Sequence, residues 1–195
     1  LMEEFERHKN HISTGIFSTK RLIDVLAANR LQDKIFELVS QKTYPGWLYM
    51  LEKGATTLWE TWEYPEHASL NHPMFGSVEE WFYESVLGIR AMSPGFEKIS
   101  IKPQPPKELT WAKGSYHSIK GIISSSWKKE GASFLLQVSI PPNTTAVIGV
   151  PCGDQQSITE KGKSISEAAG IQYLGKEAGH TLLSVGSGEY EFVVR

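Results

Sequence analysis

Aromatic and acidic residues are interleaved between residues 44 and 82, and this is the part of the sequence best suited to do chemistry. An aromatic ring can stack on the apolar C–H face of a pyranose while carboxylates hydrogen-bond its hydroxyl groups. A carboxyl group in an aromatic-walled site also tends to have a raised pKa, which helps general acid–base catalysis. The residues concerned are Trp47, Trp59, Trp62, Trp81, Glu52, Glu60, Glu63, Glu66, His67, Asn71 and His72. Composition alone favours the plainer interpretation, in which the tryptophans are core and the acids are solvated.

Two runs inside this segment change that balance. The first is Gly54-Ala55-Thr56-Thr57-Leu58-Trp59-Glu60-Thr61-Trp62-Glu63, and the second is Leu70-Asn71-His72-Pro73-Met74-Phe75-Gly76-Ser77-Val78-Glu79-Glu80-Trp81. Together they resemble the paired motifs of the bacterial α-L-rhamnosidases, glycoside hydrolase family 78. Thr14-Gly15, Tyr44-Pro45-Gly46 and Pro94-Gly95-Phe96-Glu97-Lys98-Ile99 support the resemblance, which covers about residues 10 to 128.

The resemblance implies a fold and a reaction. The family's catalytic domain is an (α/α)6 helical barrel followed by an all-β domain, and it hydrolyses terminal α-L-rhamnosides with inversion. One carboxyl group acts as general acid and a second, about 6.5–9.5 Å away, activates water. By resemblance, Glu60 is the general base and His72 contacts the rhamnose. Trp59 and Trp62 line the pocket and Asn71 orients the loop.

Two of these assignments have alternatives. Glu63 lies three residues after Glu60, on the same face if that turn is helical, so it competes for the role of base. Otherwise Glu63 is a sugar-binding or supporting acid. His72 could be a solvated loop histidine.

The family's general acid lies in an earlier, acid-rich segment, and nothing before residue 44 resembles that segment. We therefore expect this chain to carry the general-base side only, and to be inactive alone. The expected partner is a rhamnose-containing glycan or glycoside.

Other classes of function receive little support. The net charge is −2, and neither positive nor negative residues are clustered in a long run. The sequence therefore lacks the basic patch that would indicate binding to nucleic acid or to an anionic membrane. We expect no cofactor and no metal, because His8 and His11 lack a third ligand. Cys152 is the only cysteine and is expected to be an inert thiol. The sequence does not distinguish a cytoplasmic, periplasmic or secreted protein.

The chemistry-bearing segment sits among predicted helices. Apolar spacing predicts a helix over residues 18–28 with Leu22, Val25 and Leu26 on one face, and a second over 31–42. Ser77 and Glu80 have the spacing of a capping box for a further helix. Its apolar stripe is Val78, Trp81, Phe82, Ser85 and Val86, and Gly88 is placed to end it in the left-handed conformation.

Beyond Pro94-Gly95 and residues 102–107 the apolar period becomes two. Residues 134–140, 144–150, 180–185 and 190–194 read as strands separated by turn residues, which predicts a sandwich. The predicted organisation is multidomain: residues 1–95 form the last helices of a helical barrel, and residues 96–195 form an all-β sandwich.

Three or four helices with unpartnered apolar faces predict a piece of a larger domain, which could self-associate through its exposed barrel faces. Two rival functions remain open: a different helical-barrel glycosidase or lyase, and a non-catalytic carbohydrate-binding or structural sandwich. For the second, Trp111, Tyr116 and Trp127 could form a sugar-binding face, although the sequence favours packing in the sandwich core or at a domain interface for them.

Overall fold

The computed structural model describes residues 1–195, which divide into two compact units, Leu1–Trp81 and Phe82–Arg195. Each unit is described by itself. The sequence placed the boundary at residue 95, but the units divide earlier. The reason is that strand β1 (Ile89–Ala91) pairs with β2 (Lys98–Ile101), so this segment belongs to a sheet of the second unit.

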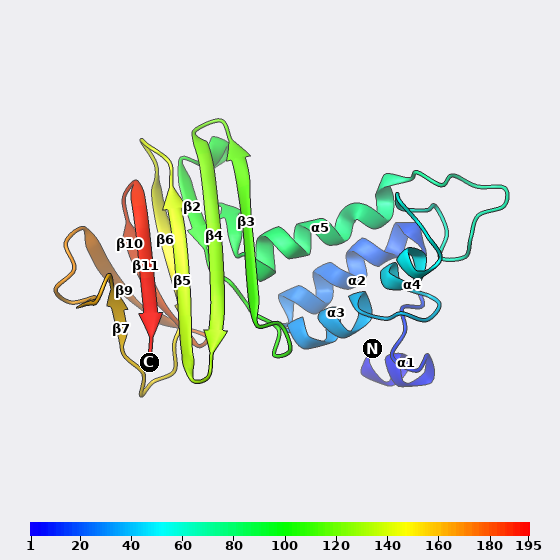
Figure 1. Ribbon diagram of the computed structural model, residues 1–195, viewed down its shortest axis with the longest axis horizontal. Helices are drawn as coiled ribbons and strands as arrows, with labels where there is room; N and C mark the ends of the chain where they lie inside the picture. The colour runs from blue at the N-terminus through cyan, green and yellow to red at the C-terminus, as the bar shows by residue number, and fades with distance from the viewer. The chain divides into compact units, whose positions relative to one another are not determined.

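The first unit is helical. Helix α2 packs on α3, on α5 and on the 3-10 helix η1, around a core that includes Leu26, Ile35 and Phe75 (Figure 1). The Trp81 indole N–H donates to Gln32 Oε1 at 2.6 Å and so ties α5 to α3. The elements are α1 (Met2–Arg7), α2 (Ile16–Ala28), α3 (Gln32–Val39), α4 (Trp47–Glu52), η1 (Pro73–Ser77) and α5 (Val78–Trp81).

The predicted apolar face of α2 is partly wrong. Val25 is 50% exposed, and the buried residues are Thr19, Ile23 and Leu26. Thr19 can be buried because its hydroxyl donates to Gly15 O at 2.8 Å, which satisfies the polar group within the helix. The buried face of α2 therefore includes a threonine, which a search for apolar residues at helical spacing does not pick out.

The predicted capping box of Ser77 and Glu80 is also wrong. The helical segment begins four residues earlier, at Pro73, whose fixed φ suits a first helical position. His72 is its N-cap, with Nδ1 accepting from Met74 N at 3.4 Å. Glu80 instead forms an ion pair with Lys20 at 2.6 Å, and the buried Ser77 hydroxyl has no hydrogen-bond partner.

We expect Ser77→Ala to leave the free energy of unfolding unchanged or to raise it by about 1 kcal/mol, because a buried hydroxyl without a partner costs about 1–3 kcal/mol. Thr19→Val is the matched control, since it removes a buried hydroxyl that is hydrogen-bonded and should cost about 1 kcal/mol. Urea unfolding midpoints measure both. A loss of stability in Ser77→Ala as large as in Thr19→Val would show that the Ser77 hydroxyl has a partner after all.

The second unit contains two sheets, as the sequence predicted for this half. One sheet has the order β1-β2-β6-β10-β9 and the other β3-β4-β5-β11-β7-β8 (Figure 1). All pairs are antiparallel except β2 with β6. Preceding the sheets, the π-helix η2 (Phe82–Val86) continues directly from α5. The other elements are η3 (Pro94–Phe96), β3 (Trp111–Ser118), β4 (Gly121–Glu130), β5 (Ser133–Ile140), β6 (Thr145–Pro151), β7 (Ile158–Glu160), β8 (Lys163–Ser164), β9 (Ile171–Glu177), β10 (His180–Val185) and β11 (Gly188–Val194).

The four strands predicted from alternation are confirmed as β5, β6, β10 and β11. On β5 the buried residues are those of the predicted apolar set, Phe134, Leu136, Val138 and Ile140. Strands β3 and β4 escaped prediction because serines and lysines occupy most of their outward positions.

The end of the helical segment is fixed to the sandwich core by two hydrogen bonds to its carbonyls. The Trp127 indole N–H donates to Val86 O at 2.7 Å, and the Ser125 hydroxyl donates to Leu87 O at 2.8 Å. Gly88 then has φ 77°, which confirms the predicted left-handed end of the helix. Phe82 is 39% exposed, so the predicted apolar stripe is buried only in part.

Of the three sandwich aromatics predicted to pack in the core or at a domain interface, Trp127 lies in the core and is 1% exposed. Trp111 is 62% and Tyr116 41% exposed. Cys152 is buried, as expected for an inert thiol. No helix has the length and apolar character that crossing a membrane requires.

Candidate active site

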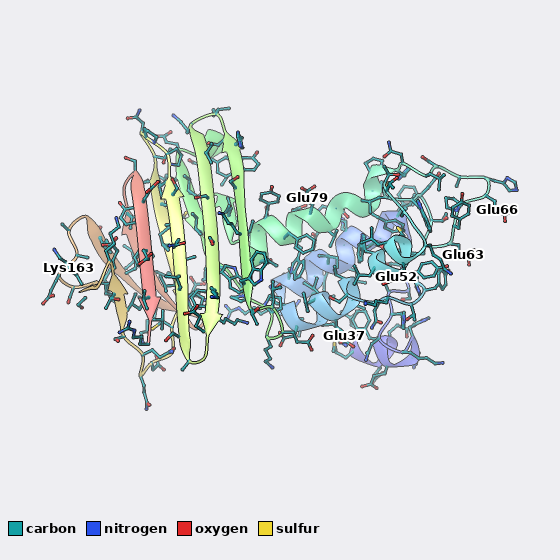
Figure 2. All side chains as sticks on the ribbon, viewed as in Figure 1. Glu37, Glu52, Glu63, Glu66, Glu79 and Lys163 are labelled. Carbon is teal, nitrogen blue, oxygen red and sulfur yellow. The ribbon has the colours of Figure 1, made fainter.

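A hollow of about 540 Å³ lies in the helical unit, within the size range of small-molecule sites. It brings together the N-terminal turn of α2, the long segment between α4 and η1, and η1 itself. Its lining residues are Gly15, Ile16, Phe17, Ser18, Tyr44, Glu60, Thr61, Trp62, Glu63 and Phe75. Figure 2 shows Glu63 and Glu66 on the segment between α4 and η1.

Backbone pairing holds Glu60 at the base of a loop. Glu60 N donates to Ser69 O at 2.9 Å, and His72 N donates to Leu58 O at 2.8 Å. The Thr57 hydroxyl adds a third hydrogen bond between the two segments by donating to Leu70 O at 2.6 Å. Glu60 and His72 therefore lie on two segments that pair with each other.

The Glu60 carboxylate is half-buried and has one fixed oxygen. Ser69 N donates to Oε2 at 2.9 Å, and no ion pair engages the group. Oε1 is left available to the hollow that Glu60 lines. A carboxylate held at one oxygen and open at the other suits the orientation and deprotonation of a water molecule.

Glu63 has a different environment. Its side chain is exposed and faces the hydroxyl of Tyr44, another lining residue. Burial, and then the Glu63 carboxylate, raise the pKa of Tyr44 above its usual value. Tyr44 therefore remains a neutral hydrogen-bond donor, and Glu63 is its acceptor.

Trp62 forms a fixed wall of the hollow. Its ring stacks on Phe75 with centroids 3.7 Å apart and meets Trp47 edge-on at 4.9 Å. Its indole N–H donates to Thr14 O at 2.6 Å, and the Trp47 N–H donates to Phe75 O at 3.0 Å. Both indole donors are thus used within the protein, so the wall offers a rigid apolar surface.

The other three predicted site residues do not line the hollow. Trp59 is 2% exposed and meets Tyr64 edge-on, with centroids 5.3 Å apart. Asn71 is exposed, and its backbone N–H and C=O both bond the Ser69 hydroxyl. His72 is half-buried; because Nδ1 accepts from Met74 N, the neutral ring carries its proton on Nε2.

Tyr44, Phe75 and the start of α2 line the hollow without having been assigned a role from the sequence. Tyr44 precedes Pro45, with a cis peptide bond between them. The sequence offered a hint only in that Thr14-Gly15 and Tyr44-Pro45-Gly46 belong to the family resemblance. The groups that line the hollow and can do chemistry are the carboxylates of Glu60 and Glu63 and the phenol of Tyr44, beside the aromatic rings of Trp62 and Phe75.

The sequence matches two protein-family models, one for each part of the chain. Residues 1–86 match the model of the bacterial α-L-rhamnosidase 6-hairpin glycosidase domain, and residues 88–164 match that of the bacterial α-L-rhamnosidase C-terminal domain. The chain belongs to the bacterial α-L-rhamnosidase family. The two matched regions meet close to Gly88, where the helical segment ends and the first strand begins.

Individual α-L-rhamnosidases agree with this assignment. Those of Streptomyces avermitilis and Formosa agariphila are 34% and 32% identical, over 94% and 98% of this chain. The chain spans only 18% and 22% of their lengths.

Solved rhamnosidase structures show the same fold. The structure from Dictyoglumus thermophilum superposes with a TM-score of 0.86 at 36% identity, covering 98% of this chain and 22% of that one. The Streptomyces avermitilis structure, complexed with L-rhamnose, gives 0.88 at 33% identity, covering 100% and 19%.

Proposed function

We propose that this chain carries the general-base side of an inverting α-L-rhamnosidase site, with Glu60 as the base. One observation supports this above the others: the Glu60 carboxylate lines an aromatic-walled hollow with one oxygen fixed by Ser69 N and no competing ion pair. Glu63, the rival base, faces Tyr44 instead.

In this proposal Glu60 Oε1 takes a proton from a water molecule as the water oxygen bonds to the anomeric carbon. The bond from that carbon to the leaving oxygen breaks, and the leaving oxygen takes a proton from a general acid. Attack on the face opposite the leaving group inverts the anomeric configuration.

The general acid must lie about 6.5–9.5 Å from Glu60 to leave room for the water. Glu63 is the other carboxyl group that lines the hollow, and Tyr44 faces it. We therefore place the acid outside this chain, on earlier helices of an (α/α)6 barrel that the helical unit completes.

The remaining predicted residues act around the base. Trp62 and Glu63 contact the sugar from the wall of the hollow. His72 does not line the hollow but lies on the segment that pairs with the one carrying Glu60, and from there its Nε2 donates to a rhamnose hydroxyl that extends beyond the lining residues. Trp59 and Asn71 hold the loop that carries Glu60, since Trp59 is buried and the Asn71 backbone is bonded to Ser69. Phe17, 79% exposed, and Leu51, 60% exposed, are apolar surface that the rest of the barrel would cover, and through which the isolated chain would associate.

The isolated chain is expected to show no turnover of an aryl α-L-rhamnoside, because it has a base without an acid. Release of the aryl alcohol, followed by absorbance, measures this. Turnover that survives further purification and is abolished by Glu60→Gln would place the acid within residues 1–195.

In an enzyme of full family length, His72→Ala should raise the Kd for L-rhamnose about tenfold, the loss expected for one hydrogen bond to the sugar. His8→Ala is the matched control, because His8 is an exposed residue at the C-terminal end of α1 and its side chain pairs with Glu4. Equal affinity in the two variants would remove His72 from the sugar site.

A further inference from the structure

A second hollow, of about 350 Å³, lies on the six-stranded sheet and is formed by the second unit alone. It is on the face opposite the core. Along β4, β5 and β11 the residues that alternate with its lining side chains are Trp127, Leu136 and Phe192, and all three are buried. The function proposed above does not use this hollow.

Strand register explains why the sheet is hollowed here. Ser126 pairs with Gln137, which pairs with Glu191, and in the next row Ser124 pairs with Ser139, which pairs with Glu189. Three of the four outward side chains on the middle strands are serines and the fourth is Gln137, while longer charged side chains stand at the sides. Lys113, opposite Ser126 on β3, closes one side. The result is a trough with a hydroxyl-bearing floor.

The polar groups of the trough are largely unused by the protein. The hydroxyls of Ser124, Ser126 and Ser139 make no hydrogen bond to another part of the chain, and neither does the Lys113 ammonium group. Gln137 Nε2 donates to Glu191 Oε2 at 2.8 Å, which fixes both side chains and leaves each with a free oxygen. Donors and acceptors therefore alternate within a few ångströms, as the paired strands set them.

The trough is lined by charged residues of both signs, which limits the classes of ligand that it could bind. Two lysines and two glutamates line the trough, Lys113 and Lys161 with Glu189 and Glu191, and Lys161 is also paired with Glu160 at 3.6 Å. Charges of both signs are therefore mixed here, and neither an anion nor a cation meets a field of one sign. Lys161 is held at the rim, with Nζ donating to Glu189 O at 2.8 Å. A neutral ligand with many hydroxyl groups, each both donor and acceptor, satisfies such a surface.

An aromatic platform lies beside the trough. Trp111 precedes Lys113 by two residues on β3, so both side chains point from the same face, roughly 7 Å apart. Trp111 is 62% exposed, which is unusual for a large apolar ring. Stacking on the C–H face of a sugar would cover it. From this combination we propose that the outer face of the six-stranded sheet binds a neutral saccharide, at a site separate from the Glu60 hollow.

The test is titration of the complete 195-residue chain with L-rhamnose, with an α-L-rhamnosyl oligosaccharide and with maltotriose, followed by amide chemical shifts. We expect shifts in β3, β4, β5 and β11 and millimolar affinity. Glu191→Ala and Trp111→Ala should each raise the Kd about tenfold or more. The responding sugar separates a rhamnosyl chain from an unrelated neutral glycan as ligand.

Two matched controls keep the result specific. Glu130→Ala removes an exposed glutamate at the end of β4, and Tyr173→Ala removes an exposed aromatic ring of the other sheet; both should leave the Kd unchanged. Ser126→Leu fills the floor and should abolish the shifts without lowering the unfolding midpoint.

His72→Ala distinguishes this site from the proposed active site, and it should leave the shifts in the sheet unchanged. Shifts that vanish in His72→Ala but persist in Glu191→Ala would place the sugar in the first hollow and overturn the proposal. An absence of sheet shifts with all three sugars at tens of millimolar would also overturn it, whatever the outcome for Glu60.

Discussion

Glu60→Gln in an α-L-rhamnosidase of full family length is expected to lower kcat on an aryl α-L-rhamnoside by about 10²–10⁴-fold, the usual contribution of general acid–base catalysis. KM should change little. Glutamine can still accept from Ser69 N, so the loop keeps its geometry, but its amide cannot take a proton from water. Steady-state kinetics on the purified enzyme measure the effect.

Glu63→Gln is the matched control, since it makes the same change three residues away on the other acid of the hollow. It should lower kcat far less and act mainly on KM. If Glu63→Gln proves the more damaging variant, Glu63 is the base and Glu60 supports the loop.

Azide provides a chemical test of the same assignment. In Glu60→Ala the nucleophile no longer has to be deprotonated, so added azide should restore part of the rate and give the β-L-rhamnosyl azide. An α-azide product would instead make Glu60 the acid–base group of a retaining enzyme, because azide would then attack a glycosyl-enzyme intermediate. No rescue at all would argue that Glu60 does not activate the nucleophile.

Gly88→Ala is expected to lower the free energy of unfolding of the second unit by about 2–5 kcal/mol. Gly88 has φ 77°, where a residue other than glycine is strained by about 1–2 kcal/mol. In addition, an added Cβ would overlap the backbone of Lys102 and Pro103, which directly follow β2. Overpacking of this kind adds about 1–3 kcal/mol.

Gly131→Ala separates the two contributions. Gly131 also has a left-handed backbone, with φ 60°, but a Cβ there would meet no atom within 4 Å. It should cost about 1–2 kcal/mol. Denaturant unfolding followed by the fluorescence of the buried Trp127 reports on both variants. Equal losses in the free energy of unfolding would mean that the backbone of residues 102–103 moves to accommodate the added Cβ at no cost.

The sequence predicted those parts of the fold whose signals are local. Gly88 ends the helical segment because a left-handed position favours glycine, and alternation on β5 marked its buried face because one face of the sheet is dry. Val25 and Ser77 were misplaced because several registers of an amphipathic helix look alike until the partner helices are known. Trp111 was not placed by any local signal, because the sequence does not show which face of β3 points outward, and in the structure it is 62% exposed.

The candidate site was predicted in part for a similar reason. The motif placed Glu60, Glu63 and Trp62, and the structure brings all three to one hollow. Tyr44 and the first turn of α2 reach it across long sequence separations, through packing of Trp62 under Thr14 that no local pattern encodes. Family resemblance supplied the chemistry of Glu60; its geometry comes from the bond to Ser69 N.

The hydrogen bonds that join Glu60 to Ser69 and Leu58 to His72 close the ends of the loop between residues 60 and 69. The position of Glu60 is therefore independent of the length of this loop. Residues within the loop can be added or removed while the same bonds close the ends, and each doubling of loop length costs only about 0.6 kcal/mol in closure entropy. Water activation can thus stay constant while the tip of the loop varies. Libraries that randomise residues 66–68, which are exposed and do not line the hollow, in number as well as identity are therefore a route to new leaving-group preferences at unchanged stereochemistry.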